Sequence, residues 1–320
     1  VYQNSFSRLN NIATDIYNTP TNFITTDSNG QSELIISMAD EFINLVSSDD
    51  TFQNLNPNVY QSVSDIRERK NRLTQDNFIL ASNFNYVRDS RDNPFDTDFS
   101  IFRIKFELAG NLLYNFSKLL NLKSNTDGAF QVSGVPFSQY IKTEVDYIKL
   151  WDLGRNNVLA LRSFFGIAIP LKNASSIPFS KSFFAGGSND NRAWTAYDLG
   201  PGSSNNNNEF NEANMKLAFS LEYRFRLFGE LDGALFTDAG NIWNVLDDVS
   251  DPKANFDNFE ALSDLGLGAG FGLRYDFDFF ILRLDTGFKA YNPSYELNSR
   301  WLKDFNFNNA VYNIGINYPF

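Results

Sequence analysis

From about residue 76 to the C-terminus, apolar and polar side chains alternate with a period of two, which is the spacing of β-strands. The clearest segment is 216–227, where Leu, Phe and Tyr share one face and Lys, Ser, Glu and Arg share the other. About nine such segments occur, most of them near the roughly 9 to 11 residues of a tilted membrane-spanning strand. They lie near 78–86, 102–108, 141–151, 159–169, 217–227, 231–243, 265–277, 280–290 and 310–320.

The connections between these segments alternate between short and long. The long ones are 117–139, 172–213, 244–264 and 291–309, and the connections between them are much shorter. A soluble β-sandwich could explain one two-faced strand, but it gives no reason to sort the loops in this way. The pattern is typical of an outer-membrane barrel, with long loops outside the cell and short turns in the periplasm. We therefore expect an all-β, transmembrane, antiparallel barrel over residues 76–320 with a periplasmic C-terminus.

Residues 1–75 show a different period. Leu9, Ile12 and Ile16 recur at helical spacing, as do the apolar residues of 35–46, with Ser32 placed to cap this second run. A weaker run follows Pro57. We expect up to three short helices in a helical or irregular segment, which lies outside the cell with the long loops.

Composition narrows the possible functions. The chain has no cysteine and no histidine, a formal net charge of −11, and 16% aromatic residues. Disulfides, thiolate nucleophiles, zinc–thiolate sites and Ser-His-Asp catalysis are therefore excluded, and the acidic balance argues against nucleic acid as a partner. No apolar run reaches the length of a transmembrane helix. We expect no enzyme activity, no catalytic residues, no cofactor and no metal.

The longest connection contains an unusual stretch at 183–203. Gly186, Gly187, Gly200 and Pro201 surround a single arginine, Arg192, and its aromatic neighbour Trp194 is followed by Tyr197. Glycine and proline indicate a loop, but a flexible linker would lack the rigid aromatic residues and the lone arginine. This loop is a candidate functional segment.

Two later strands share an inner face with few side chains. The first places Phe236, Asp238 and Gly240 on that face, and the second places Gly266, Gly268, Gly270, Gly272 and Arg274 there. Alternating glycines weaken a strand unless other backbone lies against it, so we expect the loop to pack on this wall with Arg192 bound to Asp238. The alternative is that Arg192 is solvated and that the glycines only let the sheet bend.

These motifs resemble those of the BamA/TamA outer-membrane assembly superfamily. The loop Gly186-Gly187-Ser-Asn-Asp-Asn-Arg192-Ala-Trp194 with Leu199-Gly200-Pro201-Gly202 resembles the family's inward-folded loop, and 236–240 and 268–275 resemble the partner strands. Most members have glycine and a smaller aromatic where Ala193-Trp194 stands here. The Arg-Ala-Trp form is similar to the TamA-like lipoprotein branch (TamL) of Bacteroidetes.

The C-terminal segment also resembles a feature of outer-membrane barrels. Gly315, Tyr318 and Phe320 fit the pattern of their recognition signal, although a last strand ending at an aromatic belt would look the same. The resemblance implies a closed barrel of about sixteen strands. We therefore expect further strands and periplasmic POTRA domains before Val1.

The resemblance implies an assembly or translocation factor that inserts or exports other outer-membrane or surface proteins through a lateral seam. Its implied partners are outer-membrane lipid or lipopolysaccharide, unfolded clients, and periplasmic or inner-membrane assembly proteins. Two alternatives stay open: a dedicated two-partner-type secretion pore for one client, and a structural or patatin-fused barrel with an enzyme upstream. No Gly-x-Ser-x-Gly motif occurs in this sequence.

Overall fold

The computed structural model describes residues 3–93, 96–126, 128–204, 211–247, 249, 251–277 and 279–320. The chain divides into two compact units, one built mainly from Val1–Gln75 and the other from most of the remaining residues. In the ranges given, no helix is both long enough and apolar enough to cross a membrane.

The first unit is mostly helical and has an apolar core of its own. Phe42, Val46 and Val63 are fully buried in it. Its regular elements are α1 (Gln3–Asn11), a π-helical turn (Ile12–Ile16), β1 (Ile24–Thr26), β2 (Ser32–Leu34), α2 (Ala39–Ser47), α3 (Asp50–Leu55) and α4 (Pro57–Thr74), with 3₁₀ turns at Thr21–Phe23 and Ile36–Met38. The Asp49 carboxylate accepts the Phe52 amide at 2.8 Å and caps α3.

The expectation of at most three helices and of a cap at Ser32 was wrong. The described residues of this first unit contain four α-helices and also a β-hairpin, β1 with β2. Ser32 lies in that hairpin opposite Thr26. The Asp27 carboxylate accepts the amides of Asn29 and Gln31 at 2.8 and 2.7 Å and fixes the turn, so the helical run begins only after Ile35.

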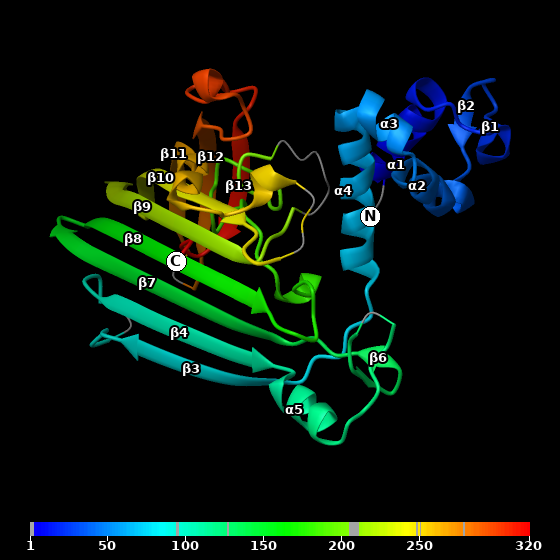
Figure 1. Cartoon of the computed structure of the whole chain (residues 1–320). Helices are drawn as coiled ribbons and strands as arrows, with labels where there is room; N and C mark the ends of the chain where they lie inside the picture. The colour runs from blue at the N-terminus through cyan, green and yellow to red at the C-terminus, as the bar shows by residue number, and fades with distance from the viewer. Residues whose placement is uncertain are drawn as a thin grey trace. The chain divides into compact units, whose positions relative to one another are not determined.

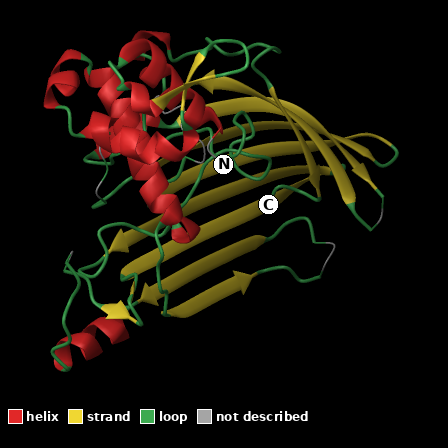
Figure 2. Cartoon of the chain, turned by 90° about the vertical axis from the view of Figure 1, so that its right-hand side faces the viewer, coloured by secondary structure: helices red, strands yellow, loops and turns green. Residues whose placement is uncertain are grey.

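The second unit is a nine-stranded antiparallel sheet in which each strand pairs with its neighbours along the chain. Figures 1 and 2 show this sheet curving from β3 to β13. Its strands are β3 (Ala81–Asp89), β4 (Ser100–Ala109), β7 (Tyr140–Gly154), β8 (Asn157–Pro170), β9 (Met215–Phe228), β10 (Leu231–Trp243), β11 (Gly266–Asp276), β12 (Ile281–Tyr291) and β13 (Val311–Ile316). The sheet is not closed, because β3 and β13 are its two edges in the described residues. The prediction of an antiparallel β-barrel fold is confirmed in this open form.

Shorter elements occupy the connections of the sheet. The connection after β4 contains α5 (Asn111–Leu119) and a small hairpin of β5 (Gln131–Val132) and β6 (Val135–Pro136). The hairpin lies within the predicted connection 117–139, whereas α5 begins before it, so this connection is longer than predicted. The 3₁₀ turns are Phe179–Lys181, Pro252–Ala254, Phe259–Asp264 and Leu297–Ser299. As predicted, long and short connections alternate along the sheet, so the long ones share one end of it.

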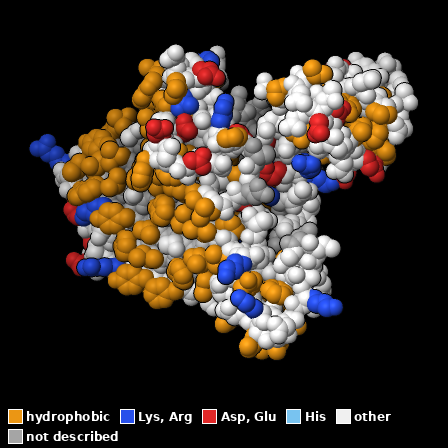
Figure 3. Space-filling view, in the orientation of Figure 1, with side chains coloured by type: hydrophobic (Ala, Val, Ile, Leu, Met, Phe, Trp, Pro, Cys, Tyr) orange, Lys and Arg blue, Asp and Glu red, His pale blue; other side chains and the backbone are white. Residues whose placement is uncertain are grey.

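The two faces of the sheet differ in chemistry. One face exposes large apolar side chains such as Leu235 and Phe271, which are 55% and 46% exposed, and Figure 3 shows apolar side chains gathered over the strands. The opposite face, called the inner face below, buries charged residues such as Glu222, Asp238 and Arg274. An apolar face turned outward and a charged face turned inward are typical of a barrel that faces lipid outside and a polar lumen inside.

The last strand is shorter than predicted. It ends at Ile316, and Asn317 has a φ of +64° that ends the alternation. The Tyr318 ring centre lies 3.9 Å from the guanidinium carbon of Arg224, and Phe320 packs against an apolar cluster around Ile101 and Ile148. Of the three residues predicted as a C-terminal strand signal, only Gly315 is therefore in the strand.

Candidate functional site

The connection between β8 and β9, residues 171–214, is called the inner loop here because its described part lies against the inner face. Its tip is a tight turn: the Gly187 amide donates to the Trp194 carbonyl at 2.8 Å, and the Gly186 amide donates to the Asp190 carboxylate at 2.7 Å. Both glycines have positive φ angles, +92° and +102°, which side chains other than glycine rarely adopt. The turn therefore presents Arg192 and Trp194 in fixed positions.

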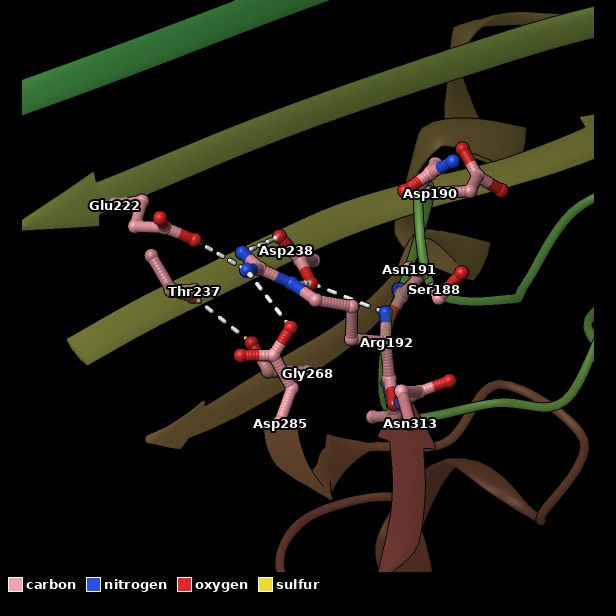
Figure 4. Close-up of polar contacts among 12 residues, drawn as sticks. Ser188, Asp190, Asn191, Arg192, Glu222, Thr237, Asp238, Gly268, Asp285 and Asn313 are labelled. Carbon is pink, nitrogen blue, oxygen red and sulfur yellow. Dashed lines mark hydrogen bonds and ion pairs between the residues drawn. The ribbon is translucent and has the colours of Figure 1, made fainter. Parts of the chain in front are cut away.

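Arg192 extends from this turn into a group of carboxylates (Figure 4). Its backbone amide and Nε donate to Asp238 Oδ2 at 3.0 and 2.8 Å, and Nη2 donates to Asp238 Oδ1 at 2.9 Å. Nη1 donates to Glu222 on β9 and lies 3.9 Å from Oδ2 of Asp285 on β12. The guanidinium carbon lies 3.5 Å from the centre of the Phe236 ring, a cation–π contact. The side chain of this one loop residue thus contacts three strands, β9, β10 and β12.

These charges are almost completely removed from solvent. Arg192 and Asp238 are each 1% exposed and Glu222 is fully buried. Burial alone would lower the pKa of Arg192, but the nearby carboxylates of Asp238, Glu222 and Asp285 raise it above its ordinary value. The guanidinium therefore stays charged, and removing it would leave the buried carboxylate of Asp238 without its ion-pair partner.

Three more arginines extend the group around Arg192. Arg274 donates to Glu222 at 3.0 Å and to Asp285 at 2.6 Å. Arg224 donates to Glu222 at 2.8 Å, and Nε of Arg283 lies 3.3 Å from Oδ2 of Asp285. Four arginines and three carboxylates leave this cluster with one net positive charge. It joins β9, β10, β11 and β12 to the inner loop.

Two further contacts anchor the inner loop to β10 and β11. Trp194 is 2% exposed and sits in an apolar cluster with Leu199 and Ile242. A Cβ added at Gly266 would lie 2.8 Å from Cδ1 of Leu199 and 3.1 Å from the Trp194 ring. Beyond Gly200 and the buried Pro201, the Gly202 amide donates to the Ile242 carbonyl at 2.8 Å, and Asn241 donates to the Gly202 carbonyl at 2.9 Å.

The predicted glycine wall has several roles. Gly268 faces the loop, since an added Cβ would lie 2.6 Å from Oδ1 of Asn191 and 2.7 Å from Cβ of Ala193. Gly270 makes room for the Phe236 ring, and Gly272 for Arg274 and Asp285. Gly240 contacts the backbone of β9 instead of the loop. The expectation that the whole wall packs against the loop therefore holds only at Gly266 and Gly268, at the start of β11 where the long connections lie.

Comparison with known proteins gives the family. The Omp85 superfamily domain matches residues 17–308, which is most of the chain. The chain belongs to the Omp85 superfamily. No curated protein matches its sequence. The predicted family is confirmed at the level of this superfamily, and the TamL branch stays a prediction.

Two solved Omp85-type structures are similar to this chain. The crystal structure of BamA from Haemophilus ducreyi lacking POTRA domains 1-3 is 16% identical, with a TM-score of 0.47 over 75% of this chain and 41% of that one. CdiB from Acinetobacter baumannii is 13% identical, with a TM-score of 0.42 over 74% of this chain and 33% of that one. The Omp85 chain described here therefore spans less than half the length of either.

The sequence did not reveal every residue that holds the inner loop of this Omp85 chain. Glu222 was placed on the inner face, but its contact with Arg192 depends on the pairing of β9 with β10. Gly287 on β12 lies under the loop backbone, where an added Cβ would overlap the Arg192 carbonyl. Asn313 on β13 donates to that same carbonyl at 2.9 Å. In the sequence, the only indication for Asn313 was that the alternation along the last strand places it on the inner face.

Asn313→Ala is expected to loosen the inner loop without unfolding the barrel. It removes one hydrogen bond to the Arg192 carbonyl, which contributes about 1 kcal/mol, or roughly a fivefold change in the opening equilibrium. Hydrogen exchange at the Arg192 and Ala193 amides of the full-length protein measures this. Tyr312→Phe, on the neighbouring outward position of β13, is the control, and equal exchange in both variants would contradict the prediction.

Proposed function

We propose that this chain is part of an outer-membrane factor that inserts or exports other proteins through a lateral seam of its barrel. The long loops and residues 1–75 face outside the cell, and the short turns and Phe320 face the periplasm. Loop asymmetry and the apolar outer face support this orientation. The expected partners are outer-membrane lipid, unfolded client proteins and periplasmic assembly proteins.

The observation that carries the proposal is the burial of Arg192 between Asp238 and Glu222. Burying a guanidinium costs free energy unless its charge and hydrogen bonds are satisfied, and here each of its three side-chain nitrogens donates to a carboxylate. A loop held in this way keeps one defined position on the inner face.

In this mechanism the inner loop holds the end of the sheet in register. Arg283 on β12 donates to the Ser188 carbonyl and to Asn189 Oδ1 at 2.9 and 2.8 Å, and Asn313 on β13 donates to Arg192. The last two strands are thereby bonded to the loop itself. β13 is a short edge of six residues, and a strand edge can pair with an incoming strand. We propose that client strands meet the protein at this edge.

Depletion of the full-length protein in its native cell tests the function. A fall in many unrelated barrel or surface proteins, with unfolded forms accumulating in the periplasm, is the result expected of an assembly factor. Loss of one exported protein alone would instead favour a dedicated exporter, and an unchanged outer-membrane proteome would overturn both.

A further inference from the structure

Helix α5 has a largely exposed apolar face. Leu112, Phe116 and Leu119 are 74%, 64% and 75% exposed and follow one another at helical spacing. Leu120 and Leu122 continue this surface just after the helix. Large apolar side chains grouped in this way are unfavourable in water and mark a surface that contacts something else.

The orientation of α5 is fixed by its other side. The Tyr114 ring packs edge-on against Phe130 at 5.6 Å between centres, and Ser117 is buried. Gln139 donates to the Asn111 side chain at 3.0 Å and holds the first turn. These contacts with the connection beneath α5 fix the orientation of the helix, so its apolar face points away from that connection.

This face continues the apolar outer face of the sheet. Phe84 and Phe106 lie opposite each other on β3 and β4 and point outward, and Leu108 follows on the same face. Only Ala109 and Gly110 separate Leu108 from α5, and the Gly110 amide donates to the Leu80 carbonyl at 2.9 Å. The exposed apolar residues thus run from the strands directly onto the helix at their long-loop end (Figures 1 and 3).

Lysines border the apolar face of α5. Lys118 and Lys123 are exposed at its C-terminal end, and Lys172 lies 6.0 Å from the Tyr114 ring centre. An amphipathic helix with a leucine and phenylalanine face and basic residues beside it is typical of a helix that lies in a membrane interface. Lysines at that depth can reach anionic phosphate groups of lipids.

We propose that α5 lies on the outer leaflet of the membrane, with Leu112, Phe116 and Leu119 among the acyl chains and the lysines at the lipid phosphates. This rests on the outer-membrane location proposed above and adds a lipid contact outside the strands. The helix would anchor the first long loop of the described sheet at the membrane surface.

Site-specific fluorescence tests this placement. This chain has no cysteine, so single cysteines at Leu112, Phe116 or Leu119 can carry an environment-sensitive dye in the full-length protein, freed of any other cysteine and reconstituted in vesicles with anionic lipid. We expect blue-shifted emission that is quenched by lipids with a doxyl group near the headgroup. Asn115→Cys, a polar position on the same helix, is the matched control and should be less quenched.

A label at Leu235, on the outer face of β10, separates this proposal from the membrane location itself. If the Leu235 label is quenched by lipid and the α5 labels emit as in water, the proposal for α5 is wrong and the barrel still lies in the membrane. Blue-shifted α5 labels that doxyl lipids do not quench would mean that protein, either another segment or a second copy, covers the helix. That result would also overturn the proposal.

Discussion

Replacing Arg192 by alanine is expected to release the inner loop and to inactivate the protein. The substitution leaves Asp238 buried without an ion pair, because Arg192 makes every side-chain ion pair of Asp238 in the described structure. Glu222 loses one of its three arginine partners and keeps Arg224 and Arg274. Breaking a buried pair by removing one partner costs about 3–5 kcal/mol. Urea unfolding of the full-length protein and protease cleavage of the loop measure the loss, and growth of a depletion strain measures the function.

Arg226→Ala is the matched control for this experiment. Arg226 is also on the inner face and also pairs with an aspartate, Asp232 at 2.6 Å, but its side chain is 33% exposed. Exposed pairs contribute about 0–1 kcal/mol, so this variant should resemble the wild type. If Arg192→Ala and Arg226→Ala behaved alike, Arg192 would not hold the loop.

Reversing the pair, with Arg192→Asp and Asp238→Arg together, is expected to restore only part of the stability. The exchange adds a carboxylate at position 192 to a buried cluster in which Glu222 has lost the Nη1 of Arg192 as a donor. Like charges in a buried site repel each other. Rescue should improve when Glu222→Gln is added, and the urea midpoints of the double and triple variants test this.

The fold was largely predictable because alternation along a strand reports which face each side chain occupies. All nine predicted segments became strands, in the predicted order. The last strand was overextended because Tyr318 and Phe320 preserve the apolar spacing after Asn317 has already left the strand. Their partners, Arg224 and the cluster around Ile101, are distant in sequence and leave no local signal.

The site was predictable only in part for a related reason. Arg192 and Asp238 are conspicuous, one as a lone arginine in a glycine-rich loop and the other as a lone carboxylate on a wall of small residues, and the structure brings them together. The alternation along β9 places Glu222, Arg224 and Arg226 all on the inner face, so it does not distinguish between them. Only the register that places Glu222 opposite Phe236 and Ser220 opposite Asp238 selects Glu222 as the second partner. Period alone does not give register.

Gly287→Val is the second substitution with a large expected effect. The backbone of Arg192 and Ala193 lies directly against Gly287 on β12. A Cβ added at Gly287 would overlap the Arg192 carbonyl carbon and oxygen. A flexible side chain could rotate away from the new valine, but the loop backbone cannot. Either the loop must therefore leave the sheet or β12 must move. Overpacking of this kind costs about 1–3 kcal/mol or more, and we expect faster loop proteolysis and loss of complementation.

Ala269→Val supplies the control for Gly287→Val, because it places the same side chain on the neighbouring strand β11 at an outward position. It should leave the loop protected and the protein active. Gly287→Val acts on the loop backbone and leaves every charge of the Arg192 cluster in the sequence. If Gly287→Val matched Arg192→Ala in loop exposure and in loss of activity, the docked position of the loop would be what function requires. An active Gly287→Val protein with an exposed loop would contradict the proposed mechanism.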